Sequence, residues 1–204
     1  STSIPEIQFK SANNEIHRIG VETATGNQGY TNSTAYSLNI FARSGRDTHF
    51  GQGTTQHMTI DSAGHVTMPL QPAFWVRRNG DESSYDFTSL TNKITFNYEE
   101  FDVNSDFNTS TGLFTAPVDG VYVFNGAVYS ASVSMAQSWF LVNNARQSGT
   151  DWVVSASANF VQNSQIIKLD ANDTVGFHGY NSSTSSGTVT AAIYHTYFKG
   201  YLMG

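Results

Sequence analysis

Short runs of alternating apolar residues, separated by turn-forming residues, constrain this chain more than any other feature of its sequence. Residues 96–124 show the pattern clearly, because they read FNYEEFDVNSDFNTSTGLFTAPVDGVYVF, with aromatic residues between Asn, Ser, Gly and Pro. Alternation with a period of two indicates half-buried strands, and many such runs with turn signals between them indicate a β-sandwich. No long segment carries the apolar stripe of an amphipathic helix. The sequence therefore predicts an all-β fold.

Composition and charge exclude several classes of protein. Charged residues make up only 13% of the chain, and the formal net charge is −6, from 10 basic and 16 acidic residues. A basic surface for nucleic acid is therefore not expected. No apolar stretch is long enough to span a membrane, and we expect no membrane insertion. Because the chain begins with Ser rather than Met, residue 1 is either a native start or a fragment boundary.

The chain contains no cysteine. Disulfides, thiolate nucleophiles and cysteine-based metal sites are therefore excluded. If the protein works outside a cell, packing and oligomerisation must supply its stability.

Residues 1–68 form a region of short alternating runs separated by Gly- and Asn-rich turns. So little apolar mass in a region of this size is marginal for an independent monomer. It would be stabilised if three copies wrapped around one axis. We therefore predict a β-rich fibre shaft or neck over residues 1–68.

Residues 58–69, MTIDSAGHVTMP, carry a hairpin signal in which alternating apolar residues flank the turn 61–64. The segment resembles the ID-S-x-G-x-V hairpin found near the ends of bacteriophage tail-fibre shafts, just before a distal domain. An ordinary hairpin closing a small β domain is the alternative. Pro69 and Pro72 follow, and two prolines so close together cannot lie inside a central strand. We therefore predict a domain boundary here, with the second domain over residues 69–204.

The second domain resembles the C1q family, whose fold is shared with tumour necrosis factor. The resemblance covers residues 72–204 and includes the opening Pro72-Ala73-Phe74, the turn 169–175 and the closing run 198–202. The central matching residues are Phe96, Asp102, Phe107, Phe114, Gly120, Tyr122 and Phe124. This resemblance implies a jelly-roll sandwich that forms a homotrimer. Gly126 departs from the family, which usually has an aromatic residue there, so we expect a thinner core or room for Trp139 or Tyr129.

Strand alternation separates the residues of these strands by face. By the resemblance, Tyr122, Phe124 and Phe198 fill the sandwich. Their neighbours on the opposite face would then meet the next copy around a trimer axis. The predicted trimer-interface residues are Val123, Asn125, His195 and Tyr197. Near an axis, Asn125 and His195 could hold water or an ion, or could simply hydrogen-bond across the interface.

Two polar loops with aromatic residues are candidates for contact with a receptor. Residues 143–152 and 180–187 combine amides, an arginine, a carboxylate and aromatic rings with Ser and Gly. Such sets provide adaptable hydrogen bonding together with rigid contact area, and similar sets recognise sugars. The predicted receptor-binding residues are Arg146, Asp151, Trp152, Tyr180 and Asn181. The alternative is that both loops are solubilising turns.

Metal and catalytic motifs are weak. Acidic clusters at 99–106 and 170–173 offer the oxygen ligands that calcium prefers, and some members of the complement-like family bind calcium, although solvated loop charge is the alternative. His57 and His65 flank the hairpin but lack a third ligand for a metal. The nucleophile elbow, the P-loop and the GxGxxG motif are all missing from the sequence. We therefore predict no catalytic residues, no metal-ligand set, no cofactor other than calcium, and a protein that is not an enzyme.

These observations favour the receptor-binding tip of a phage tail fibre, located in the distal fibre of the virion. Its expected partners are other copies of itself, a bacterial surface glycan or outer-membrane protein, and other fibre or baseplate proteins. A structural cap for a trimeric fibre and a polysaccharide depolymerase are the alternatives. An animal complement-like protein is disfavoured, because residues 1–68 lack a collagen G-x-y repeat.

Overall fold

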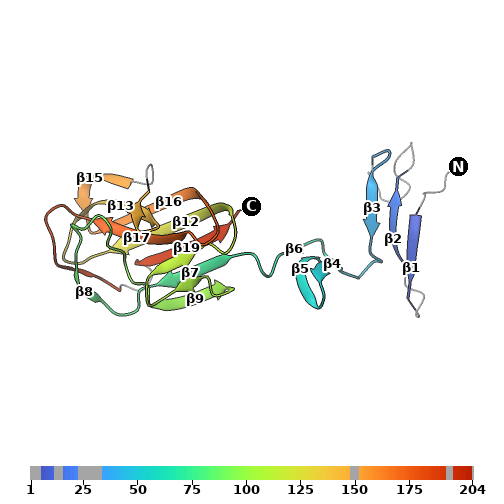
Figure 1. The fold of residues 1–204 in the computed structure, drawn as a ribbon, viewed down its shortest axis with the longest axis horizontal. Coiled ribbons are helices and arrows are strands. Elements are labelled where there is room, and N and C mark those ends of the chain that lie inside the picture. The colour runs from blue at the N-terminus through green and yellow to red at the C-terminus, as the bar shows by residue number, and fades with distance from the viewer. Residues whose placement is uncertain (1–5, 12–15, 23–33, 148–151, 192–194, 204) are drawn as a thin grey trace. The chain divides into compact units, whose positions relative to one another are not determined.

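A computed structural model of the chain describes residues 6–11, 16–22, 34–147, 152–191 and 195–203. Every regular element in these ranges is a β-strand, which confirms the all-β prediction. None of the described segments is a helix that could cross a membrane. The chain divides into two compact units, Ser1–Pro69 and Leu70–Gly204 (Figure 1).

The first unit contains two small antiparallel sheets. The first sheet has the order β1-β2-β3, and the second has the order β4-β5-β6. Their strands are β1 (Glu6–Lys10), β2 (Ile16–Val21), β3 (Leu38–Phe41), β4 (Thr48–Gln52), β5 (Thr55–Ile60) and β6 (Val66–Thr67).

The predicted hairpin at residues 58–69 is confirmed. Ile60 pairs with Val66, and the turn between them is organised by Asp61. The Asp61 carboxylate accepts hydrogen bonds from the backbone N–H groups of Ala63 (2.8 Å) and His65 (2.9 Å). Gly64 adopts a φ of 91°, which glycine tolerates at no steric cost. The turn is therefore fixed by an Asx-type contact and one glycine.

The second unit is a sandwich of two antiparallel sheets with a small two-stranded addition. The five-stranded sheet has the order β16-β12-β19-β7-β9. Its strands are β7 (Ala73–Arg77), β9 (Tyr98–Val103), β12 (Gly120–Tyr129), β16 (Phe160–Leu169) and β19 (Tyr197–Leu202).

The six-stranded sheet faces it. It has the order β10-β11-β17-β13-β14, with β15 also paired to β13. Its strands are β10 (Phe107–Asn108), β11 (Leu113–Thr115), β13 (Met135–Val142), β14 (Ala145–Arg146), β15 (Trp152–Ala158) and β17 (Thr174–Tyr180). The pair β8 (Glu82–Tyr85) and β18 (Gly187–Val189) completes the unit.

Phenylalanine rings fill the space between the two sheets. Phe74 stacks on Phe107 and Phe114 with ring centroids 5.2 and 5.0 Å apart, and it meets the edge of Phe198 at 5.0 Å. As predicted, Tyr122, Phe124 and Phe198 are buried in this core. Because alternate residues of one strand point to opposite faces, this core leaves the odd-numbered residues 121–125 of β12 on the outward face of the five-stranded sheet.

Gly126 continues the inward-facing row of β12, and the ring of Phe177 occupies the space beside it. A Cβ atom at Gly126 would lie 2.6 Å from that ring. The expectation that Trp139 or Tyr129 would take this space is therefore wrong. On β13, Phe140 points into the core beside Phe177, with ring centroids 5.1 Å apart, so alternation turns Trp139 to the opposite face.

We predict that Gly126→Ala destabilises the protein by about 1–3 kcal/mol, because the new methyl group overpacks the core against the Phe177 ring. Gly176→Ala is the matched control, since the atoms nearest to its methyl would belong to the side chains of Leu113 and Lys93, at the longer distances of 3.2–3.3 Å. Urea unfolding of both variants measures the difference. Equal midpoints for the two variants would contradict the packing described here.

Candidate functional site

The outward face of the five-stranded sheet carries an apolar surface in the single chain. Strand register places Ile166, Val123 and Tyr201 side by side on β16, β12 and β19. The exposed fractions of Ile166 and Tyr201 are 64% and 52%, and Phe101 on β9 is 48% exposed. Large apolar side chains grouped in this way on a folded domain mark an interaction surface.

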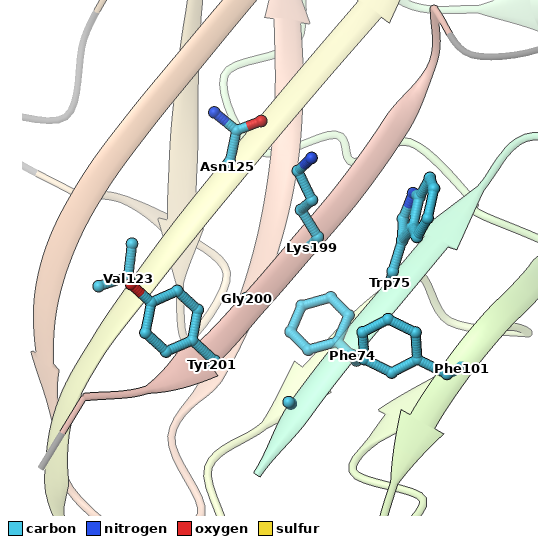
Figure 2. A pocket seen from close by; sticks show the side chains of 9 residues that line it. Phe74, Trp75, Phe101, Val123, Asn125, Lys199, Gly200 and Tyr201 are labelled. Carbon is cyan, nitrogen blue, oxygen red and sulfur yellow. The ribbon is translucent and has the colours of Figure 1, made fainter. Parts of the chain in front are cut away.

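A hollow of about 370 Å³ lies in the middle of this surface, as Figure 2 shows. Side chains of Trp75, Phe101, Val123 and Tyr201 surround it. Gly200 forms part of its lining, and the core requires glycine there, because a Cβ atom would lie 2.5 Å from the Phe124 ring. Gly200 therefore contributes backbone atoms to the hollow, while the Phe124 ring fills the space on its inward side.

Polar groups on this face lie beside aromatic rings. The Nζ atom of Lys199 is 4.8 Å from the ring centroid of Tyr197 and 5.6 Å from that of Trp75. Farther along the sheet, the Arg77 guanidinium lies 3.9 Å from the Tyr98 ring centroid and pairs with the Glu100 carboxylate. A cation over an aromatic ring is still stabilised by that ring when solvent is removed. The charges of Lys199 and Arg77 are therefore compatible with partial burial in an interface.

The structure brings the four predicted interface residues onto this outward face. Val123, Asn125 and Tyr197 are half-buried there, and Asn125 is directly opposite Lys199 in the strand register. His195 is exposed at the end of the sheet, where its ring lies 5.6 Å from Tyr129. Their role between copies of the chain stays a prediction.

A second candidate surface lies on the outward side of the six-stranded sheet. The Arg146 guanidinium is 4.2 Å from the ring centroid of Trp139, and the Tyr180 ring is 5.1 Å from it. Arg146 is exposed and Tyr180 half-exposed, whereas Trp139 is fully buried. Two of the predicted receptor-binding residues, Arg146 and Tyr180, thus both contact Trp139, which was not among those predicted.

The other three predicted receptor-binding residues have different outcomes. The Asn181 side chain donates to the Ser134 carbonyl (2.6 Å) and accepts from the Ser183 backbone N–H (2.7 Å), so it holds its own loop in place. Asp151 lies outside the described residues. Trp152 is described only through its backbone, which pairs with Ser138 in β13.

A buried Tyr–His pair lies beside Trp139. His178 is opposite Trp139 in the register, and its Nδ1 lies 2.5 Å from the Tyr85 hydroxyl. Burial lowers the pKa of His178 from 6.5 to about 4, and burial also raises the pKa of Tyr85 well above its usual value. At neutral pH the phenol and the imidazole are therefore both uncharged, and they share one hydrogen bond.

Carboxylates of both acidic clusters make hydrogen bonds within their own loops. The Asp102 carboxylate accepts backbone hydrogen bonds from Phe107 (2.8 Å) and Asp106 (3.2 Å). Asp173 accepts from the Asn143 side-chain amide (2.7 Å), and this bond is the main cause of its lowered pKa. Within the part of the chain that the structure describes, no three His, Asp or Glu side chains are placed to hold a metal ion. His65 contacts Asp61 (2.8 Å) within the hairpin turn instead.

Comparisons with known proteins agree with this architecture for the second unit. A model of the C1q domain family matches residues 73–203. Among solved structures, the globular domain of zebrafish complement 1qA protein is 21% identical, covers 66% of this chain and 98% of that chain, and has a TM-score of 0.47. Eiger TNF from S. frugiperda is 13% identical, with coverage of 66% and 94% and a TM-score of 0.43. Murine APRIL is 11% identical, with coverage of 65% and 99% and a TM-score of 0.46. A comparison with curated proteins gives no match.

The Tyr85–His178 pair predicts that acid destabilises the fold. Because the pKa of His178 is about 4 when folded and 6.5 as its ordinary value, only the unfolded chain binds this proton between those pH values. The free energy of unfolding therefore falls as the pH is lowered through that window, by up to about 3 kcal/mol. Urea unfolding at several pH values from neutral to mildly acidic measures the slope.

The variant His178→Gln tests the assignment of this slope to one side chain. Glutamine keeps an acceptor for the Tyr85 hydroxyl but does not titrate, so the pH dependence should become flatter. Tyr85→Phe keeps the imidazole and should keep the slope. An unchanged slope in His178→Gln would assign the acid sensitivity to other groups.

Proposed function

The chain belongs to the C1q domain family through residues 73–203, and on this premise we propose that it is the receptor-binding tip of a bacteriophage tail fibre. Domains of this family are generally trimeric binding or recognition modules and are typically not enzymes. In our proposal three copies assemble. Residues 1–68 form an intertwined β shaft or neck, and residues 69–204 form the heads.

One observation carries this proposal: the two outer faces of the sandwich differ in chemistry. The five-stranded sheet exposes apolar side chains such as Ile166, Tyr201 and Phe101, which are suited to burial against other copies. The six-stranded sheet instead presents the guanidinium of Arg146 and the ring of Tyr180 over a buried tryptophan. One face therefore fits assembly and the other fits recognition.

The phage context is supported by the hairpin before the head. Its β5–β6 pairing and its Asp61-centred turn have the form of the ID-S-x-G-x-V hairpin of tail-fibre shafts. The virion's distal fibre, with other fibre or baseplate proteins as neighbours, is the corresponding location.

The target in this proposal is a bacterial surface glycan or an outer-membrane protein. An arginine and a tyrosine on a rigid support provide hydrogen bonds and stacking area, which are the contacts that sugars and polar protein loops use. A single site of this kind binds weakly. Three linked copies on one fibre would raise the effective affinity strongly, because binding of the second and third sites becomes intramolecular.

Staining of a panel of bacteria with the labelled protein, with phage as competitor, tests the proposal. We expect strain-selective staining that phage displaces. The variant Arg146→Ala should weaken it by about tenfold or more, as expected for a contact worth ~1.4 kcal/mol. Arg43→Ala is the matched control, since Arg43 is exposed in the first unit and carries the same charge. A folded trimer that stains no strain, or undiminished staining by Arg146→Ala, would count against this assignment.

The apolar outward face also favours a second function, in which the head only nucleates and closes a trimeric fibre. Both functions require that face to be buried between copies. Val123→Asp should therefore convert the trimer to a monomer in sedimentation velocity, because a carboxylate buried among apolar side chains is strongly unfavourable.

Val118→Asp is the control for this substitution. Val118 is 46% exposed and lies outside the strands of that sheet, so the variant should remain trimeric. If the wild type sediments as a monomer, both functions fail. A trimer that assembles through Val123 but stains no bacterium would favour the structural cap.

A further inference from the structure

The three-stranded sheet β1-β2-β3 has one apolar face and one polar face. Strand register aligns Ile7 with Ile19 and Ile19 with Ile40 across the sheet, and Val21 with Leu38. Phe9 shares this face with Ile7, two residues before it on β1. The apolar face thus consists of Ile7, Phe9, Ile19, Val21, Leu38 and Ile40, each between 40% and 66% exposed. His17, paired with Phe9, is the one titratable residue among its described members.

Polar side chains on the opposite face pair with one another across the sheet, although the Nε atom of Arg18 is buried without a hydrogen-bond partner. The Arg18 guanidinium pairs with Glu6 at 3.5 Å and lies 5.6 Å from the ring centroid of Phe41. The Asn39 side-chain amide donates to the Glu22 carboxylate at 3.4 Å. An antiparallel sheet commonly has one solvated face and one face against a core. The polar face here has the character of the solvated one.

The core that the apolar face requires is not found within the described part of the first unit. Among those residues only Glu22 and Thr59 are buried, and neither is apolar. The remaining positions of this unit add little, because Ile4 and Tyr30 are their only large apolar residues in the sequence. An antiparallel sheet of this size is not stable with six such side chains in water.

Small units without a core are usually stabilised by disulfides, by a structural metal or by oligomerisation. The chain has no cysteine, and the residues described in this unit offer no metal-binding group of three ligands. Oligomerisation is the remaining means. The unit is also joined covalently to a head whose family is generally trimeric, which would hold three copies of the apolar face at high local concentration.

We propose that the face Ile7/Phe9/Ile19/Val21/Leu38/Ile40 packs against the same face of the other copies, so that the first unit folds only in the assembled protein. This inference rests on the trimer of the proposed function. It adds that the shaft has no fold of its own: its core is made from three chains. The polar face with Glu6 and Arg18 is then the outer surface of the shaft.

Hydrogen exchange on the full-length protein tests this proposal with a matched pair on one strand. Ile7 and Gln8 are neighbours on opposite faces of β1, and Gln8 is opposite Arg18 in the register. In Ile7→Asp the head should still hold the trimer, but amides of residues 6–11 and 16–22 should exchange about tenfold faster or more, because the carboxylate must be buried among apolar side chains. Gln8→Asp loses the Gln8–Glu6 hydrogen bond but places its carboxylate opposite Arg18 on the polar face, so it should exchange much more like the wild type than Ile7→Asp does.

The monomeric variant Val123→Asp supplies a second, independent arm. Its head amides should keep their protection, whereas residues 6–11 and 16–22 should lose theirs. Protection of these residues in a monomer, equal protection in Ile7→Asp and Gln8→Asp, or a monomeric wild type would each overturn the proposal. Absence of bacterial staining, with the exchange pattern as expected, would remove only the receptor-binding function and would leave this inference intact.

Discussion

The layer of aromatic rings between the two sheets determines where everything else in the head can lie. Phe74, Phe114, Phe124 and Phe198 touch one another across strands that are far apart in the sequence. Glycine at 200 gives the Phe124 ring the room it needs, and glycine at 126 does the same for the ring of Phe177. Because the inward residues of each strand pack in this layer, the residues next to them along the strand must point outward. The packing of this layer therefore determines which residues form the apolar face with its hollow and which form the Arg146–Trp139 surface.

Much of this arrangement could be predicted from the sequence, because it depends on local patterns. Alternation separated Tyr122 and Phe124 from Val123, and the family resemblance then placed the first two in the core. The hairpin around Asp61 was predicted from an Asx residue, a following glycine and the flanking apolar pairs. In both cases the information lies within a few residues along the chain.

Other features depend on contacts that only the three-dimensional register decides. Tyr85 and His178 are 93 positions apart, and no motif links them before β17 is placed under the 85–95 segment. Trp139 is fully buried although it faces away from the core between the sheets, and its value to the candidate site comes from Arg146 on the adjoining β14. Phe177 fills the space beside Gly126 although Trp139 and Tyr129 are closer to Gly126 in the sequence. The composition of the loop at residues 180–187 indicated that the Asn181 amide binds a ligand. In the structure, the nitrogen and the oxygen of that amide both make hydrogen bonds to the protein backbone.

The attachment of β14 and β15 to the same strand has a consequence for how such a protein can diversify. Both strands pair with β13, whose inward residue Phe140 is fixed by the core. The pairing of both strands with β13 therefore does not depend on the sequence that connects them, which can change without disturbing the buried layer. Mutation and selection can therefore alter the ligand preference of such a head separately from the surfaces through which its copies would associate.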